Sequence, residues 1–150
     1  MDDIDRRILR HMQSDPTASI AALADAVGLS QTPCWRRLKR METDGIIIGR
    51  ALLLDERKIG LGVDVFAHIR LKMHDEATLN ELESAVMSHP QIVECFSMSG
   101  ESDYLMRVIA ASIDDYERFL KKTLLHLPGV ASVNSSFALQ RIKLTTALPL

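Results

Sequence analysis

The sequence predicts an α+β protein in two parts, and three observations support this prediction. Apolar residues recur at helical spacing in three short segments before Gly45. Strict strand alternation begins at Val63. A strand–helix–strand pattern then occurs twice, with a repeat of 38 residues that relates Pro90 to Pro128. We therefore expect a helical domain at residues 1–60 and a mixed domain at residues 61–150.

The composition is that of a folded, water-soluble protein. The 150 residues are 47% hydrophobic and 25% charged. No apolar run approaches the roughly 18 residues that a membrane span requires, and the start MDDIDRR lacks the pattern of a signal peptide. The sequence thus predicts a cytoplasmic protein with no membrane partner. Cys34 and Cys95 lack CxxC spacing, so we expect core thiols rather than a disulfide or a zinc site.

Two helices are predicted before residue 30. Helical spacing of apolar residues and acidic residues in the first turn indicate a helix within residues 1–15, which Pro16 ends. Ser19 can cap a second, short helix that ends at Gly28. Only Leu29 then separates Gly28 from the next cap, so a tight turn is expected here.

The third predicted helix covers residues 30–44, with Ser30 as its N-cap and Gly45 after its end. Its inward residues recur at i, i+4 and i+7 and are Cys34, Leu38 and Met41. The opposite side is basic. Helix, glycine turn and basic helix form the helix-turn-helix layout, in which the second helix enters the major groove. An unrelated three-helix domain with a solvated basic face would show the same pattern.

Double-stranded DNA is the partner that this basic helix predicts. The net charge of −2 does not exclude it, because residues 36–58 hold seven basic and four acidic residues. The segment IIIGRALLLD after the helix predicts a hairpin wing. Arg50 in this wing could touch phosphates or merely solvate an exposed strand edge. The expected DNA-binding residues are Gln31, Thr32, Arg36, Arg37, Lys39, Arg40 and Arg50.

The second part is predicted to have the order βαββαβ. Its strands are expected at 63–73, 92–98, 104–110 and 130–142, and its helices at 76–88 and 112–127. This ferredoxin-like arrangement places both helices on one face of a four-stranded antiparallel sheet. We expect Phe66, Phe96 and Phe137 on the open face, which predicts self-association as a dimer or larger homo-oligomer.

Enzyme signatures are absent from the sequence. It has no Gly-rich phosphate loop, no nucleophile elbow and no HExxH motif, and its five histidines are scattered. We therefore expect no catalytic residue, no metal site and no cofactor. Trp35 is expected to pack against a neighbouring helix, and Cys34 to be a core residue rather than a redox-responsive thiol.

The turn between the second and third strands of the second part is the candidate effector site. A free amino acid needs hydrogen-bond donors for its carboxylate and acidic or carbonyl oxygens for its ammonium, and this turn offers both. Its residues are Ser99, Gly100, Glu101, Ser102, Asp103 and Tyr104. Alternatively, Gly100 and Asp103 simply form the turn, with Asp103 accepting local backbone N–H bonds.

The chain resembles the Lrp/AsnC family of transcription regulators over nearly its whole length. The matching stretches are IDRRILRHMQSD, ALADAVGLSQTPCWRRLKRMETDGII, MSGESDYL, and LLHLPGV followed by SSFALQRIKLTTALP. The resemblance implies an N-terminal winged helix-turn-helix, a C-terminal ferredoxin-like ligand-sensing domain, and dimers that assemble into octameric discs. It also implies amino acids as effectors, bound near the turn at 99–104 between neighbouring dimers.

Two functions from different classes remain open on the sequence. One is a sequence-specific DNA-binding transcriptional regulator, modulated by an amino acid or related metabolite at an inter-subunit site. The other is a small-molecule-binding regulatory module of a metabolic enzyme, without DNA binding, because ferredoxin-like folds host many activities. The basic third helix favours the first, since a metabolic module has no need of it.

Overall fold

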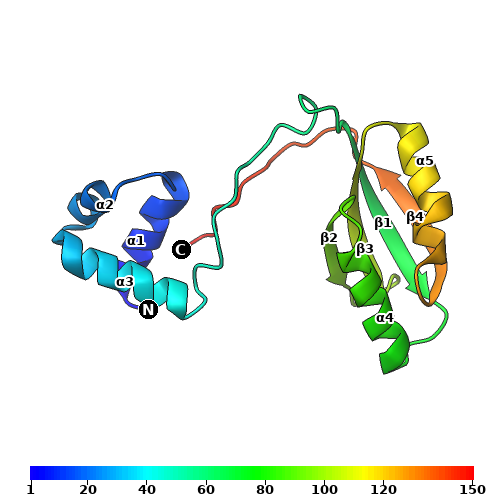
Figure 1. The fold of residues 1–150 in the computed structure, drawn as a ribbon, viewed down its shortest axis with the longest axis horizontal. Coiled ribbons are helices and arrows are strands. Elements are labelled where there is room, and N and C mark those ends of the chain that lie inside the picture. The colour runs from blue at the N-terminus through cyan, green and yellow to red at the C-terminus, as the bar shows by residue number, and fades with distance from the viewer. The chain divides into compact units, whose positions relative to one another are not determined.

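The computed structural model describes all 150 residues, which divide into two compact units. The first unit contains residues 1–53 and 142–150, and the second contains residues 54–141. The first unit consists of helices and the second of a sheet with helices packed on it, as Figure 1 shows. No helix in the chain is both long enough and apolar enough to cross a membrane.

The first unit confirms the three predicted helices. They are α1 (Asp3–Ser14), α2 (Ile20–Val27) and α3 (Gln31–Thr43). Asp2 caps α1 in a capping box with Asp5, and the Ser19 hydroxyl accepts a hydrogen bond from the first turn of α2. Gly28 ends α2 at φ 71°, a left-handed conformation that glycine adopts without strain and that turns the chain into α3.

One apolar core holds these helices together. Its buried members are Ile8, Leu9, Leu23, Ala24, Val27, Cys34, Leu38 and Met41. The end of the chain returns to this unit: Leu150 packs against the core, and the Gln13 side chain exchanges hydrogen bonds with the backbone of Leu148. No periodicity in the sequence indicated this return.

The predicted wing is not formed. No strand occurs between α3 and Val63, and no backbone hydrogen bond pairs the two apolar runs around Gly49. Gly49 does not adopt the positive φ that a two-residue hairpin turn needs at its first central position. The apolar side chains here are exposed, and Ile48 is 97% exposed. β-propensity alone does not make a strand, because a strand also needs a neighbour to pair with and to pack against.

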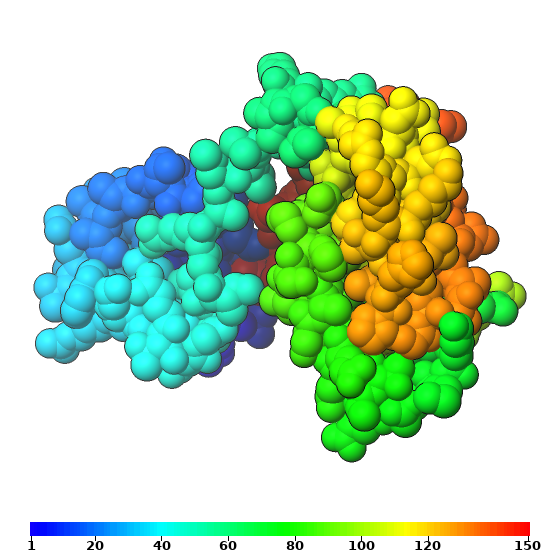
Figure 2. All heavy atoms as spheres, turned by 45° about the vertical axis from the view of Figure 1, so that its right-hand side comes forward, coloured from blue at the N-terminus to red at the C-terminus, as the bar shows by residue number.

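The second unit confirms the βαββαβ order. Its elements are β1 (Val63–Leu71), α4 (Glu76–Met87), β2 (Ile92–Ser97), β3 (Tyr104–Ala110), α5 (Ile113–Lys122), the 3-10 helix η1 (Leu124–His126) and β4 (Val130–Phe137). The strands form one antiparallel sheet in the order β2-β3-β1-β4. Both α4 and α5 cover the same face, as Figure 1 shows, and Figure 2 shows this helix-bearing side with α5 in yellow.

The second core lies between the sheet and these helices. From β1 it takes Val65, Ala67, Ile69 and Leu71, which alternate along the strand as predicted. From α4 and α5 it takes Leu82, Val86, Tyr116 and Phe119. The predicted helix at 112–127 is interrupted, because α5 ends at Lys122 and η1 follows.

A β-bulge in β4 overturns the expected position of Phe137. Leu71 pairs with Val130, whereas Arg70 pairs with Ser132, so Ala131 is an extra residue in the strand. The insertion shifts the alternation, and Phe137 lies opposite Val65 on the helix-bearing side. There its ring meets that of Tyr116 edge-on, at 5.4 Å between centroids. β4 also ends at Phe137, short of the predicted Ile142.

Phe66 and Phe96 do lie on the open face of the sheet, as predicted. Leu105 pairs with Phe96 of β2, so these two apolar side chains lie side by side on β2 and β3, and the other partner of Leu105 is the polar His68 of β1. Phe96 is 53% exposed. Apolar side chains exposed on a sheet face are typical of surfaces that take part in protein–protein contacts.

Candidate DNA interface and effector site

The outer side of α3 is the candidate DNA interface. Cys34, Leu38 and Met41 are buried against α1 and α2, which leaves the opposite side of the helix in solvent. Gln31 and Thr32 are exposed in the first turn, and the exposed Arg36 follows one turn later without an ion-pair partner. These three residues lie where a recognition helix contacts base edges.

The other basic residues of this surface have acidic partners within the unit. Lys39 Nζ lies 2.6 Å from Glu42 Oε2, and Arg50 lies 3.8 Å from the same carboxylate. Arg37 Nη1 lies 2.6 Å from Asp2 Oδ2. That guanidinium lowers the pKa of the Asp2 carboxyl to about 2.

Asp5 is the acidic partner shared by Arg37 and Arg40. Its oxygens lie 2.8 Å from Arg37 Nη1 and 2.6 Å from Arg40 Nη2. The sequence predicts that all four basic residues of α3 contact DNA. The structure separates them into the free Arg36, the weakly tied Lys39 and a pair of arginines bound to α1. A partner 35 residues away in the sequence leaves no signal in the spacing of α3 itself.

Trp35 and Cys34 have different surroundings. Trp35 is expected to pack against a helix, and its side chain is only half covered, at 50% exposure beside the basic side of α3. Cys34 is fully buried, and this burial raises the pKa of its thiol. A buried, protonated thiol is unreactive, which agrees with the core role expected of Cys34.

The predicted effector turn connects β2 to β3. Ser99, Gly100 and Glu101 are exposed, and Gly100 has φ 128° with open space where a side chain would stand. A ligand can therefore approach the backbone closely here. Tyr104 faces the other way: it is 5% exposed, and its hydroxyl donates to Glu83 of α4 at 2.8 Å.

Both oxygens of Asp103 already have partners. Oδ2 accepts the Leu71 backbone N–H at 2.7 Å, and Oδ1 lies 2.8 Å from His74 Nε2. The Leu71 N–H, with a smaller effect of His74, lowers the pKa of the Asp103 carboxyl. Asp103 therefore binds groups of its own fold, as the alternative expects, but these lie 32 and 29 residues away and are not the local backbone N–H groups that the alternative predicted. Glu101 is then the carboxylate of the turn without such a partner.

A polar hollow of about 430 Å³ lies on the open sheet face beside this turn. It brings together two of the six predicted effector residues, Glu101 and Ser102, with residues of β1 and β4. Its full lining is His68, Arg70, Glu101, Ser102, Ser132, Asn134 and Ser136. Arg70 supplies a cation for a carboxylate and Glu101 an anion for an ammonium. Ser132, Asn134 and Ser136 of β4 could not be predicted as part of the site, because the bulge determines which β4 residues share this face.

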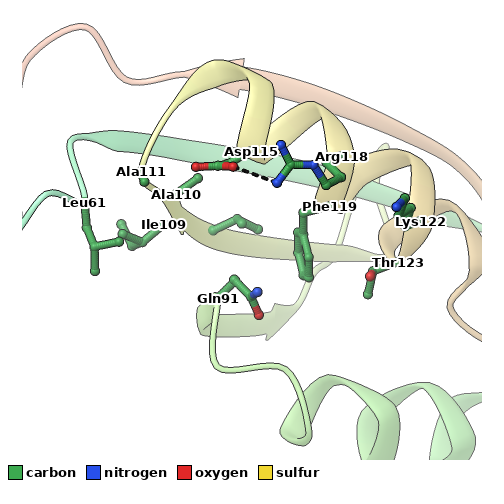
Figure 3. Close-up of a pocket in the computed structure, with 11 residues that line it drawn as sticks. Leu61, Gln91, Ile109, Ala110, Ala111, Asp115, Arg118, Phe119, Lys122 and Thr123 are labelled. Atoms are coloured by element: carbon green, nitrogen blue, oxygen red, sulfur yellow. Dashed lines mark hydrogen bonds and ion pairs between the residues drawn. The ribbon is translucent and has the colours of Figure 1, made fainter.

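A second pocket, of about 370 Å³, lies between α5 and the end of β3 (Figure 3). Its floor is apolar and includes Ile109 and Phe119. At its rim Asp115 and Arg118 form an ion pair at 2.9 Å, drawn as a dashed line in Figure 3. None of the predicted effector residues lines it. No group of three or more His, Cys, Asp or Glu side chains in the chain could hold a metal ion.

Comparison with known proteins places both units in one family. Residues 1–42 match the AsnC-type helix-turn-helix domain, and residues 64–148 match the Lrp/AsnC ligand binding domain. The chain is 45% identical to the DNA-binding transcriptional activator DecR of Escherichia coli strain K12, over 100% of this chain and 99% of that protein.

Comparison with solved structures indicates the same family. An AsnC family transcriptional regulator from Agrobacterium tumefaciens is 44% identical, with a TM-score of 0.93 over 99% of this chain and 97% of that one. A transcriptional regulator from Neisseria meningitidis, solved in complex with L-Met, is 33% identical, with a TM-score of 0.94 over 99% and 96% of the two chains. The fold, the two matched domains and these similarities together show that the chain belongs to the Lrp/AsnC family of transcriptional regulators.

Proposed function

We propose that this protein is a transcriptional regulator that binds double-stranded DNA through α3 of residues 1–60 and senses an amino acid through residues 61–150. The observation that supports it most is the exposed side of α3, where Gln31, Thr32 and Arg36 follow the glycine turn of a helix-turn-helix. Gln31 and Thr32 read base edges, and Arg36 contacts a base or a phosphate. Acting on DNA also places the protein in the cytoplasm.

Lys39 and Arg50 contact phosphates in this proposal. Both side chains pair with Glu42 at the surface. Such surface ion pairs contribute little to stability, so DNA phosphates can replace Glu42 at little cost. Arg37 and Arg40 contribute less than their charge suggests, because Asp5 holds both of them.

Self-association is part of the proposal. The open face of the sheet exposes Phe96 and partly exposes Phe66, and covering them with a second copy removes apolar surface from water. A dimer also presents two copies of α3, which suits a near-palindromic site with half-sites in successive major grooves.

The effector is an amino acid or a related small metabolite. The polar hollow supplies a cation, a carboxylate, three serine hydroxyls and one amide within one site, as a zwitterion requires. Ser99 and Gly100 directly precede Glu101 of the hollow in the sequence and are exposed, so we include them in the proposed site. The L-Met complex of the Neisseria relative supports the choice of ligand class.

The test begins with selection of bound duplexes from a random-sequence pool. The selected duplex and a scrambled version are then titrated by fluorescence anisotropy at several salt concentrations, without and with each of the twenty amino acids. We expect selective binding that one or more amino acids change, since a ligand shifts binding only through unequal affinity for two states. Equal, weak binding of both duplexes would instead support the alternative, a regulatory module of a metabolic enzyme. The similarity to a DNA-binding transcriptional activator speaks against that alternative.

A further inference from the structure

Asp5 is the one charged residue that the fold buries, at 1% exposure. It lies in the first turn of α1, yet its two oxygens bind α3. Oδ1 accepts from Arg37 at 2.8 Å, and Oδ2 accepts from Arg40 at 2.6 Å and from the Asp2 backbone N–H at 2.9 Å. A buried carboxylate needs such partners, because its transfer out of water is costly unless its charge is compensated.

The carboxylate is ionised at neutral pH. Burial acts to raise the pKa of Asp5, but hydrogen bonds with the Asp2 backbone and with Arg37 outweigh it, so the pKa lies below its ordinary value. Two charge-assisted hydrogen bonds therefore join Asp5 of α1 to α3, the proposed recognition helix. Such bonds are short, directional and roughly twice as strong as neutral ones.

These directional bonds restrict the rotation of α3 about its own axis more tightly than the apolar core does. Cys34, Leu38 and Met41 keep one side of α3 inward, but apolar burial is non-directional and tolerates a small rotation of the helix. Arg37 and Arg40 are three residues apart, so they hold α3 to α1 on adjacent turns. A rotation of α3 about its axis would break one or both bonds.

We propose that Asp5 is a positioning residue for sequence-selective DNA binding. By holding Arg37 and Arg40 it fixes the rotation of α3, and with it the direction in which Gln31, Thr32 and Arg36 point. It also keeps two guanidinium groups out of sequence-independent phosphate contacts. This inference rests on the proposed DNA-binding function, but it assigns to an acidic residue outside the DNA surface the role of improving selectivity.

The proposal and a simple charge argument predict different outcomes for Asp5→Asn. If only charge matters, removing one acid near DNA should raise the affinity for every duplex alike. If Asp5 positions α3, the variant should bind the selected duplex more weakly while the freed Arg37 and Arg40 sustain or raise binding to the scrambled duplex. Selectivity, the ratio of the two dissociation constants, therefore separates the two arguments.

Asp3→Asn is the matched control. Asp3 lies in the same first turn and loses the same charge, but it is exposed and has no ion-pair partner. For Asp5→Asn we expect selectivity to fall by at least about tenfold, comparable to the loss of one good base contact. The salt slope for the scrambled duplex should steepen by up to about 0.9 for each arginine that gains a phosphate. Asp3→Asn should leave selectivity unchanged.

Arg40→Lys provides a second variant that keeps the charge and leaves Asp5 paired with Arg37. A lysine cannot reproduce the planar fork of arginine, so selectivity should fall in the same direction by a smaller factor. This variant decides the question if Asp5→Asn unfolds. Unchanged selectivity in Arg40→Lys, or equal losses in Asp5→Asn and Asp3→Asn, would overturn the inference alone. A wild-type protein without selective binding would overturn the proposed function as well.

Discussion

Arg141 and Glu56, which are 85 residues apart, form a two-pronged ion pair. Arg141 Nη1 lies 2.6 Å from Glu56 Oε2, and its Nη2 lies 2.9 Å from Oε1. Arg107, Asp64 and, at 3.7 Å from Arg107, Glu94 of the sheet extend this pair into a cluster of two arginines and three carboxylates. The cluster holds the segment that enters β1 and the segment that leaves β4 against the same end of the sheet.

This cluster should make the second unit sensitive to acid. The pKa of Glu56 is lowered chiefly by its hydrogen bond with Arg141. Burial acts to raise the pKa of Asp64, but the bonds from Arg107 and Arg141 outweigh it and lower the pKa. Lowered carboxyl pKa values stabilise the fold above the ordinary values of 4.5 for Glu56 and 3.8 for Asp64. The stabilisation is lost as the pH falls below them.

We predict that Arg141→Ala lowers the free energy of unfolding of the second unit by about 1–2 kcal/mol at pH 7, and by less near pH 3. Urea unfolding can follow each unit separately, since Trp35 lies in the first unit and both tyrosines lie in the second. Arg118→Ala, which breaks an exposed pair, is the control. Equal losses for Arg141→Ala at both pH values would contradict the assigned role of the carboxylates.

Local patterns in the sequence predicted the three helices of the first unit and the βαββαβ order of the second, but they also predicted a wing that is not formed. Contacts between residues far apart in the sequence could not be predicted from them. The spacing of Cys34, Leu38 and Met41 gave α3 its buried side, and strand alternation gave β1 its core residues. The side of the sheet on which Phe137 lies depends on a bulge, which adds one residue and reverses the alternation. The alternation of residues along a strand does not reveal where such an extra residue is inserted.

The candidate sites show the same division. Exposure of Gln31 and Arg36 followed from helix periodicity. The partners of Arg37, Arg40 and Asp103 did not, because each bond joins residues about 30 or more positions apart. The polar hollow likewise combines β1, β4 and the turn, which only the strand order brings together.

For DNA binding, Arg36→Ala should be the most costly single truncation on α3. Arg36 is exposed and unpaired, so all of its interaction is available to DNA. We expect a loss of about 1–3 kcal/mol for the selected duplex if it reads a base. If it contacts only phosphate, both duplexes should lose affinity equally and the salt slope should fall by about 1. Anisotropy titrations of both duplexes, with Arg118→Ala as a control on the other unit, distinguish these outcomes.

Self-association should depend on the open sheet face. Phe96→Ser removes a large, 53% exposed apolar side chain from that face. We expect sedimentation velocity to show a shift toward monomer at micromolar concentration, because the apolar area buried between copies decreases. Leu125→Ser is the matched control, since Leu125 is 44% exposed on η1, away from the open face. If Leu125→Ser dissociates the oligomer and Phe96→Ser does not, the interface does not lie on the open sheet face.

The polar hollow should bind the effector through Arg70. A carboxylate held by an arginine gains charge-assisted hydrogen bonds worth about 1.5–3 kcal/mol, so Arg70→Ala should weaken binding roughly 10- to 100-fold. Calorimetry on each amino acid that stabilises the wild type against heat measures this change. Gly100→Val should also weaken binding, since φ 128° is strained for valine and the turn must rearrange.

Two further variants separate ligand contact from folding and one pocket from the other. Asp103→Ala should lower stability without any ligand by about 1–3 kcal/mol, because the Leu71 N–H loses its acceptor. Thermal shifts must therefore be compared with each variant's own unliganded midpoint. Arg118→Ala should leave binding unchanged; loss of binding there, with Arg70→Ala unaffected, would assign the ligand to the apolar pocket of Figure 3. If no amino acid at millimolar concentration shifts the midpoint or the affinity for the selected duplex, an amino-acid effector is ruled out.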